Sequence, residues 1–260
     1  MIDTILNMDC LKGLAEMETN SVDITITSPP YNIDHGVSAG KSQSFYVGNT
    51  FATGDYYKWL KKVVSELIRV TKHYVFFNIQ IVGESKEAIF QLMADFKNCI
   101  KEVIIWHKKQ NSYSSFPYMM LNCYEFVIVF CKPYLAEIRS FERCNFNNMN
   151  GSNIKNVLYG DNASVTELGN ERNHNHKAVF PQYFARFFIN NFSKQGDLIL
   201  DPFMGSGTVA IVAKQTGRHY VGFEIVKEFC DLANKRATEK AGWDWDNIPE
   251  SPESIHREET

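Results

Sequence analysis

The sequence predicts an α/β protein built on a doubly wound, mostly parallel sheet. Along most of the chain, short apolar runs that suit buried strands alternate with longer segments whose apolar residues recur at helical spacing. One of the last strands runs into a glycine loop at residues 202–207, an arrangement typical of ligand sites in such sheets. The length of 260 residues suits one large domain, and no internal repeat is found.

The first half of the chain is expected to supply four strands and two helices. The helices rest on apolar spacing, as at Leu60, Val63, Leu67 and Ile68 in the first of them. The last two strands are continuously apolar, which is expected of strands covered on both faces. The predicted strands are 22–27, 73–79, 103–106 and 126–130, and the predicted helices are about 55–70 and 84–96.

The second half is expected to begin with a helix at Pro181, since the fixed φ of proline suits a first helical turn. A helix at 208–216 should end at Gly217, a residue that commonly caps helix C-termini. The remaining predicted elements are strands at 197–201 and 219–224 and a last helix at about 226–241.

Two segments have no period. Residues 32–54 are rich in Gly, Ser and Asn and are expected to form a long loop, a kind that is usually functional or mobile. Residues 133–175 are rich in asparagine, with six from position 145 to position 156, and are expected to form a polar insert.

Composition bounds the classes of function. The chain is 44% hydrophobic and 22% charged, as in ordinary soluble domains, and no apolar run is long enough for a membrane span. The start of the chain does not have the pattern of a signal peptide. The six cysteines form no C-x-x-C pair, which favours reduced core residues of a cytosolic protein and no metal site. The net charge of −3 gives no overall sign of a nucleic-acid partner.

The glycine loop predicts a cofactor site. Glycines such as Gly205 and Gly207 let a ligand approach the backbone closely, and an acid about 20 residues later, here Glu224, is placed to accept from ribose hydroxyls. The loop departs from the dinucleotide pattern, because Ala210 stands at the third glycine position and Asp201 would repel a pyrophosphate. A cofactor with a ribose, a cationic end and no phosphate fits better, and S-adenosylmethionine has those features.

A second motif is the tetrapeptide Ser-Pro-Pro-Tyr after the strand at 22–27. Its prolines fix the backbone, so that the Ser28 side chain and the Pro29 carbonyl can point at one spot. Two such acceptors could hold the N–H bonds of an exocyclic amino group and turn its lone pair toward a methyl donor. Tyr31 offers a ring on which an extruded base can stack.

Together the two motifs resemble those of the DNA amino-methyltransferases, which make N4-methylcytosine or N6-methyladenine. The tetrapeptide precedes the glycine loop in the sequence. This order of the two motifs is similar to the permuted order of the family's beta class. The resemblance covers most of the chain and implies a Rossmann-like S-adenosylmethionine-dependent methyltransferase fold with circularly permuted motif order. It implies a catalytic half at 1–132, a target-recognition insert at 133–172, a cofactor-binding half at 173–243 and an acidic tail at 244–260.

Three further segments carry the resemblance, and one of them, Asn122–Lys132, resembles the family's strand before its target-recognition region. Asp9-Cys10-Leu11 resembles a family segment near the cofactor adenine, with Met8 in place of the usual Gly. Residues 176–181 resemble the family's His-Pro-Ala-x-Phe-Pro segment, with Lys177 in place of Pro. The expected catalytic residues are Ser28, Pro29, Pro30 and Tyr31. The expected cofactor-binding residues are Asp9, Cys10, His176, Phe180, Asp201, Phe203, Gly205, Ser206, Gly207, Thr208 and Glu224.

The resemblance implies a site-specific DNA methyltransferase that acts on an amino group of a flipped base. Cytosine N4 is favoured, because serine at the first motif position is commoner among the family's cytosine enzymes. Residues 32–34, Asn-Ile-Asp, resemble adenine enzymes and keep adenine N6 open. The rival hypotheses are an amino-methyltransferase for RNA or protein glutamine, and a non-catalytic cofactor-binding partner of an active homologue.

The expected partner is double-stranded DNA, without a membrane, in the cytoplasm of a bacterium or from a phage gene. A homodimer and a cognate restriction endonuclease stay open. Residues 107–113, which are basic and aromatic, fit a grip on phosphates and a solvated loop equally well. Trp106 is expected in the core.

Overall fold

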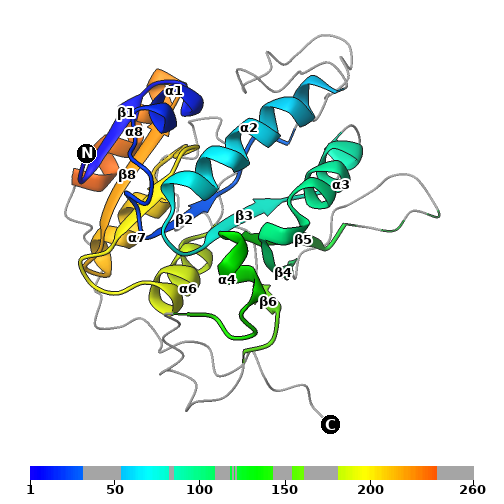
Figure 1. The fold of residues 1–260 in the computed structure, drawn as a ribbon. Helices are drawn as coiled ribbons and strands as arrows, with labels where there is room; N and C mark the ends of the chain where they lie inside the picture. The colour runs from blue at the N-terminus through cyan, green and yellow to red at the C-terminus, as the bar shows by residue number, and fades with distance from the viewer. Residues whose placement is uncertain are drawn as a thin grey trace.

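Eight strands form one sheet in the part of the chain that the computed structural model describes, namely residues 1–31, 54–81, 85–108, 118, 120, 122–142, 154–160 and 181–238 (Figure 1). The strands are β1 Thr4–Asn7, β2 Ile24–Thr27, β3 Val75–Ile79, β4 Ile100–Lys108, β5 Tyr124–Phe130, β6 Val157–Gly160, β7 Leu198–Asp201 and β8 His219–Glu224. The helices are α1 Cys10–Ala15, α2 Asp55–Val70, α3 Ser85–Asp95, the 3-10 turn η1 Lys97–Cys99, α4 Pro133–Glu137, α6 Gln182–Phe192, α7 Thr208–Gln215 and α8 Lys227–Thr238.

The strand directions determine which strand ends lie together at one edge of the sheet. The order is β1-β8-β7-β2-β3-β5-β4-β6, and within it β5 alone runs antiparallel to its neighbours β3 and β4. The predicted mostly parallel sheet is therefore confirmed. Because β5 is reversed, its amino end lies at the same edge as the carboxyl ends of the other seven strands.

The chain leaves β2 and β7 in opposite directions. β2 and β7 are paired, while β3 lies beyond β2 and β8 lies beyond β7. Such a divergence is a topological switch point, and ligands of open α/β sheets bind in the crevice that it creates at the carboxyl edge. The predicted tetrapeptide and glycine loop both follow these two strands.

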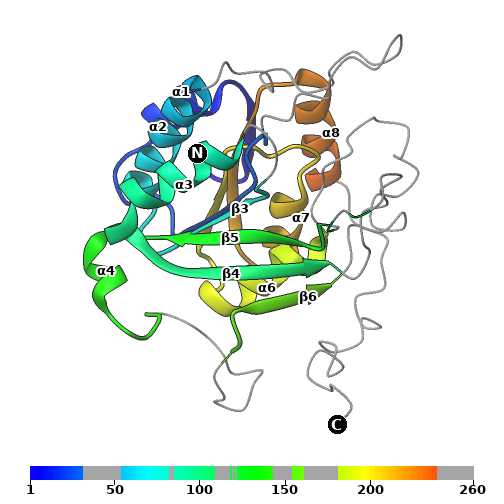
Figure 2. The same ribbon diagram turned by 90° about the vertical axis from the view of Figure 1, so that its right-hand side faces the viewer.

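Helices cover both faces of the sheet, which gives three layers (Figures 1 and 2). Helices α6, α7 and α8 pack on one face through apolar residues that include Phe184, Phe188 and Val212. Helices α1, α2 and α3 pack on the other face, where Leu14, Leu60 and Leu92 are fully buried. Strands with apolar residues on both faces, such as β3, lie between the two layers.

The predicted strands and helices of the described residues are all present, with shifted ends. The largest shift is in β4, which was expected at 103–106 and spans Ile100–Lys108. Trp106 lies in the core, as predicted. Most of the predicted loop at 32–54 and the end of the last predicted helix fall outside the described residues.

Five of the described elements were not predicted, namely β1, α1, η1, α4 and β6. The last two lie within the predicted polar insert, where α4 follows β5 directly and β6 pairs in parallel with β4. The register sets Trp106 opposite Leu158, and both are buried. Part of the segment at 133–172 therefore completes the sheet.

The aromatic packing under α6 should contribute much of the stability. Phe188 is fully buried, and its ring lies 4.4 Å from that of Phe76 and 5.0 Å from that of Phe184. We expect Phe188→Ala to lower the free energy of unfolding by about 3–5 kcal/mol in chemical denaturation, since it leaves a cavity. Phe90→Ala, at an exposed position of α3, should change it by about 0.5 kcal/mol or less. Equal losses in the two variants would contradict this view of the core.

Candidate active site

The glycine loop is folded around the carboxylate of Asp201, the last residue of β7. Asp201 Oδ1 accepts a hydrogen bond from the backbone N–H of Phe203 at 3.0 Å. Gly205 and Gly207 have φ values of +53° and +89°, which favour glycine. A Cβ on Gly207 would also lie 3.0 Å from the Cβ of Ala233 in α8, so the loop and helix approach closely because this residue is glycine.

Glu224, the last residue of β8, holds the loop from the other side. Its Oε2 accepts from the Gly205 N–H at 2.8 Å, and its Oε1 accepts from the Val226 N–H at 2.9 Å. Burial raises the pKa of this carboxyl, and the hydrogen bonds from Val226 and Gly205 oppose the rise. The predicted pairing of an acid with the glycine loop is thus a direct contact in the structure.

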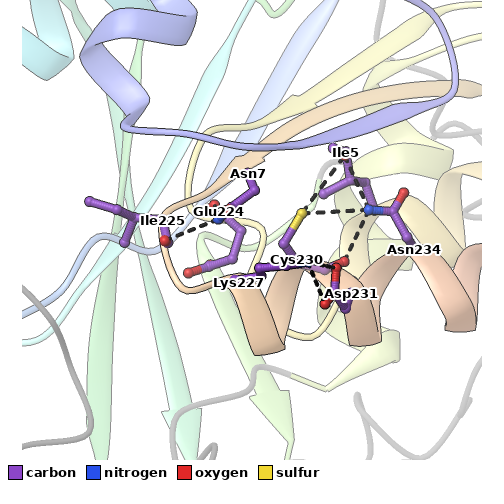
Figure 3. A network of polar contacts seen from close by, with 8 residues as sticks. All are labelled: Ile5, Asn7, Glu224, Ile225, Lys227, Cys230, Asp231 and Asn234. Atoms are coloured by element: carbon purple, nitrogen blue, oxygen red, sulfur yellow. Dashed lines mark hydrogen bonds and ion pairs between the residues drawn. The ribbon is translucent and has the colours of Figure 1, made fainter.

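The exit of β1 fixes the backbone after Glu224 (Figure 3). Asn7 Nδ2 donates to the carbonyls of Glu224 and Ile225 at 2.9 and 3.1 Å, and the Met8 N–H donates to the Glu224 carbonyl. Asn234 of α8 donates to the carbonyl of Ile5 in β1 at 3.1 Å. Ile225 is left exposed beside Glu224 at this edge.

The structure gives Asp9 and Cys10 defined places near this corner. Asp9 is the N-cap of α1, and its side chain accepts from the N–H groups of Leu11 and Lys12. Cys10 is buried in the core, where burial raises the pKa of its thiol to about 12. A cofactor role for these two residues stays a prediction. The predicted residues His176 and Phe180 lie outside the described residues.

The Ser-Pro-Pro-Tyr corner lies directly beside the glycine loop. Thr27, the last residue of β2, donates its hydroxyl to Asp201 Oδ1 at 2.8 Å, and both side chains are buried. Ser28 follows at once and is half-buried. The two motifs, which the chain separates by more than 170 residues, therefore meet through one hydrogen bond.

Helix α2 makes a second link between the motifs through aromatic residues of its first turns. The Tyr56 hydroxyl donates to the carbonyl of Pro30 at 2.6 Å. Tyr56 stacks on Trp59, whose ring lies 5.6 Å from that of Phe203 in the glycine loop. These contacts were not predicted, although the aromatic residues at the start of the predicted helix were a signal.

Tyr31 joins the corner to the antiparallel part of the sheet. Its hydroxyl lies 3.0 Å from Ser28 Oγ, donates to Glu125 Oε2 at 2.9 Å and accepts from Asn78 Nδ2 at 3.0 Å. Burial and the charge of Glu125 raise the pKa of Tyr31 well above its ordinary value, so the phenol keeps its proton.

Sequence reasoning missed Asn78 and Glu125 of this network, and it placed Lys108 in a segment that fits a grip on phosphates or a solvated loop. Asn78 lies at the end of β3, Lys108 at the end of β4 and Glu125 at the start of β5. Lys108 forms an ion pair with Glu125, so its ammonium is held in the site instead of being free to grip phosphates. The signal was a polar residue at the end of an otherwise apolar strand.

Asp201 has an unusual acidity. Burial raises its pKa from 3.8 to about 7, and the charge of Glu224 adds to this rise. The hydrogen bonds from Thr27 and Phe203 oppose it. A carboxyl of this kind is typical of a functional site, where a cation can restore its charge.

The edge of the sheet at the carboxyl ends of β2, β7 and β8 fits a ligand with hydroxyls and a cationic group. Ser206 Oγ in the loop and Asn78 Oδ1 below the corner are buried without a hydrogen-bond partner among the described residues. Such atoms suit groups that arrive with a ligand. No group of three His, Cys, Asp or Glu side chains in the described ranges could hold a metal ion. None of the helices described there is long and apolar enough to cross a membrane.

The fold, the glycine loop with its two acids and the Ser-Pro-Pro-Tyr corner define the class of protein. The chain belongs to the DNA methylase family of N6/N4 methyltransferases, whose model matches residues 22–235. This confirms the family and the enzyme class that the motifs indicated, namely DNA methyltransferases of the amino-methylating type.

Individual relatives agree with this assignment. The orphan methyltransferase M.BamHII of Bacillus amyloliquefaciens is 26% identical in an alignment of 257 residues, and the match covers 83% of this chain and 88% of the relative. The fold is shared with PvuII DNA methyltransferase (cytosine-N4-specific), at a TM-score of 0.70 and 18% identity over 92% of this chain and 87% of that one. It is also shared with M1.HpyAVI in a complex with S-adenosylmethionine, at a TM-score of 0.58 and 20% identity over 91% of this chain and 99% of that one.

The raised pKa of Asp201 predicts a pH dependence of stability. Between pH 4 and 7 the folded protein keeps a proton on Asp201 that the unfolded chain has released, so raising the pH through this window lowers the free energy of unfolding. Asp201→Asn keeps the acceptor for Thr27 and Phe203 but removes this proton. Its stability relative to wild type should therefore rise with pH across the window, by at most about 1.4 kcal/mol per pH unit. Parallel curves in urea denaturation would contradict the shift.

Proposed function

We propose that this protein transfers the methyl group of S-adenosylmethionine to an exocyclic amino group of a DNA base, with cytosine N4 favoured. The observation that carries the proposal is the hydrogen bond between Thr27 and Asp201. It sets the serine of the corner beside the glycine loop at the switch point of the sheet, where a methyl donor and an acceptor must meet.

The residues around the loop suit the parts of this cofactor. Glu224 is positioned to accept from ribose hydroxyls, since each of its oxygens has a further lone pair beyond its backbone hydrogen bond. Gly205 and Gly207 leave room for close approach, and Asp201 suits the cationic end of the molecule. When bound, S-adenosylmethionine supplies a methyl group activated on a positively charged sulfur.

The corner acts on the base. An amino group conjugated to the ring is a poor nucleophile, because its lone pair is delocalised. Ser28 Oγ and the Pro29 carbonyl accept its two N–H bonds and turn the lone pair toward the methyl group. This geometry requires a base turned out of the duplex, since the amino edge is otherwise paired and the site lies at the end of the sheet. Tyr31 contributes one wall of the pocket.

The choice of cytosine N4 rests on the serine at the first motif position. The family resemblance associates serine with cytosine enzymes, and the segment at 32–34, which resembles adenine enzymes, lies outside the described residues. We further propose that residues 133–172 read the DNA sequence. Helix α4 and strand β6 attach this segment to the end of the sheet next to β4.

Label transfer tests the function. We expect purified protein with radioactive S-adenosylmethionine to label unmethylated genomic DNA, and nucleoside mass spectrometry to find N4-methylcytosine. Ser28→Ala should cut turnover by at least tenfold with little change in cofactor affinity, since its acceptor acts on the base. N6-methyladenine alone would reverse the choice of base, and label on RNA or protein but not on DNA would overturn the proposal.

Cofactor affinity tests the loop separately. Glu224→Ala removes a charged acceptor and should weaken the binding of S-adenosylmethionine more than tenfold in calorimetry, about 1.5–3 kcal/mol. Glu228→Ala removes an exposed carboxylate in the first turn of α8, and this variant should bind as wild type does. Wild-type affinity in the Glu224 variant would remove the support for this cofactor site.

A further inference from the structure

The hydroxyl of Tyr31 has all its hydrogen-bonding positions filled. A phenol has one proton to donate and two lone pairs that accept. The proton is given to Glu125 Oε2, and Asn78 Nδ2 donates to one lone pair. The remaining position faces Ser28 Oγ at 3.0 Å. Because Tyr31 has no second proton, Ser28 must be the donor of that bond.

The hydrogen bonds from Ser28 through Tyr31 to Glu125 form a hydrogen-bond chain. The direction in which its protons point decides what Ser28 offers to a base. With its proton directed at Tyr31, Ser28 Oγ presents only lone pairs to the site. In the opposite direction, the serine proton would be free to point at the amino nitrogen. It would then occupy the lone pair that has to attack the methyl group.

Glu125 is the group that sets the direction. It is 5% exposed and lies at the end of the hydrogen-bond chain, and a carboxylate can only accept hydrogen bonds. Its second oxygen is held by the ammonium of Lys108, which also lies 4.5 Å above the ring of Trp106. Asn78 Nδ2 donates to Glu125 at 2.7 Å as well as to Tyr31, so the carboxylate is held on three sides.

We propose that Glu125 is a positioning residue that orients the hydrogen bonds from Ser28 through Tyr31, so that Ser28 acts only as an acceptor toward the amino group of the base. This inference rests on the proposed function. It assigns a role to the start of β5 that follows from neither motif. Glu125 acts through Tyr31 and Ser28 and does not itself contact the base.

The test uses two nearly isosteric variants and their combination in the full-length protein. Glu125→Gln introduces an amide that can donate to Tyr31 and reverse the chain, and Tyr31→Phe removes the hydroxyl alone. We expect each to slow single-turnover methyl transfer to DNA by at least tenfold at saturating DNA, with unchanged affinity for S-adenosylmethionine. The double variant should be no slower than the slower single variant, because both changes break the same chain.

A matched control is available at the opposite edge of the sheet. Asp23, just before β2, is 7% exposed and forms an ion pair with Lys72 at 3.0 Å. Asp23→Asn therefore removes a lysine-paired carboxylate that is buried to a similar extent as Glu125, and it should leave the rate of methyl transfer unchanged.

Melting temperature supplies a readout that does not depend on activity. The shifts caused by Glu125→Gln and Tyr31→Phe should be less than additive in the double variant if the two side chains are bonded as described. Additive melting shifts, a wild-type rate in Tyr31→Phe, or a full effect of Glu125→Gln in the Tyr31→Phe background would each overturn the inference. A wild-type protein that labels no amino group would instead overturn the proposed function. The comparison of melting temperatures among the single and double variants would still test the hydrogen-bond chain.

Discussion

The buried hydrogen bond between Thr27 and Asp201 is the constraint on which the site depends. It exists only because β2 and β7 are neighbouring parallel strands that end at the same level, which in turn requires the doubly wound order of the sheet. A carboxyl removed from water at this point is costly, and the donors on Thr27 and Phe203 offset part of the cost. One group thereby fixes both the exit of β2 and the turn of the glycine loop.

Helix α2 adds a mechanical connection to this electrostatic one. Tyr56 holds the carbonyl of Pro30, while Trp59 packs against Phe203, so the same two turns of helix contact both motifs. The rest of α2 buries Leu60, Val63 and Leu67 under the sheet, which anchors these contacts in the core. A shift of the helix would move the base-binding corner and the cofactor loop together.

The parts of the site that could be predicted from the sequence are local in the chain. Asp201 and Glu224 lie within one strand–loop–helix–strand unit, so spacing alone relates them. The network at Glu125 draws one residue from each of three strands and cannot be read from spacing, because it depends on strand pairing. The missed strands β1 and β6 are four residues long, and each is stabilised by pairing with a longer neighbour instead of by its own pattern.

The reversed strand β5 also links the site to the register in which the sheet folds. Side chains alternate along a strand, so Glu125 reaches Tyr31 only in the observed register, in which it lies opposite Trp106. A slip by one residue would turn the carboxylate toward the opposite face, among the apolar side chains under α2 and α3, and would leave Lys108 without its partner. Two charges without partners would make that misfolded sheet less stable. The same ion pair that serves the site therefore also selects the correct pairing of the β4–β5 hairpin.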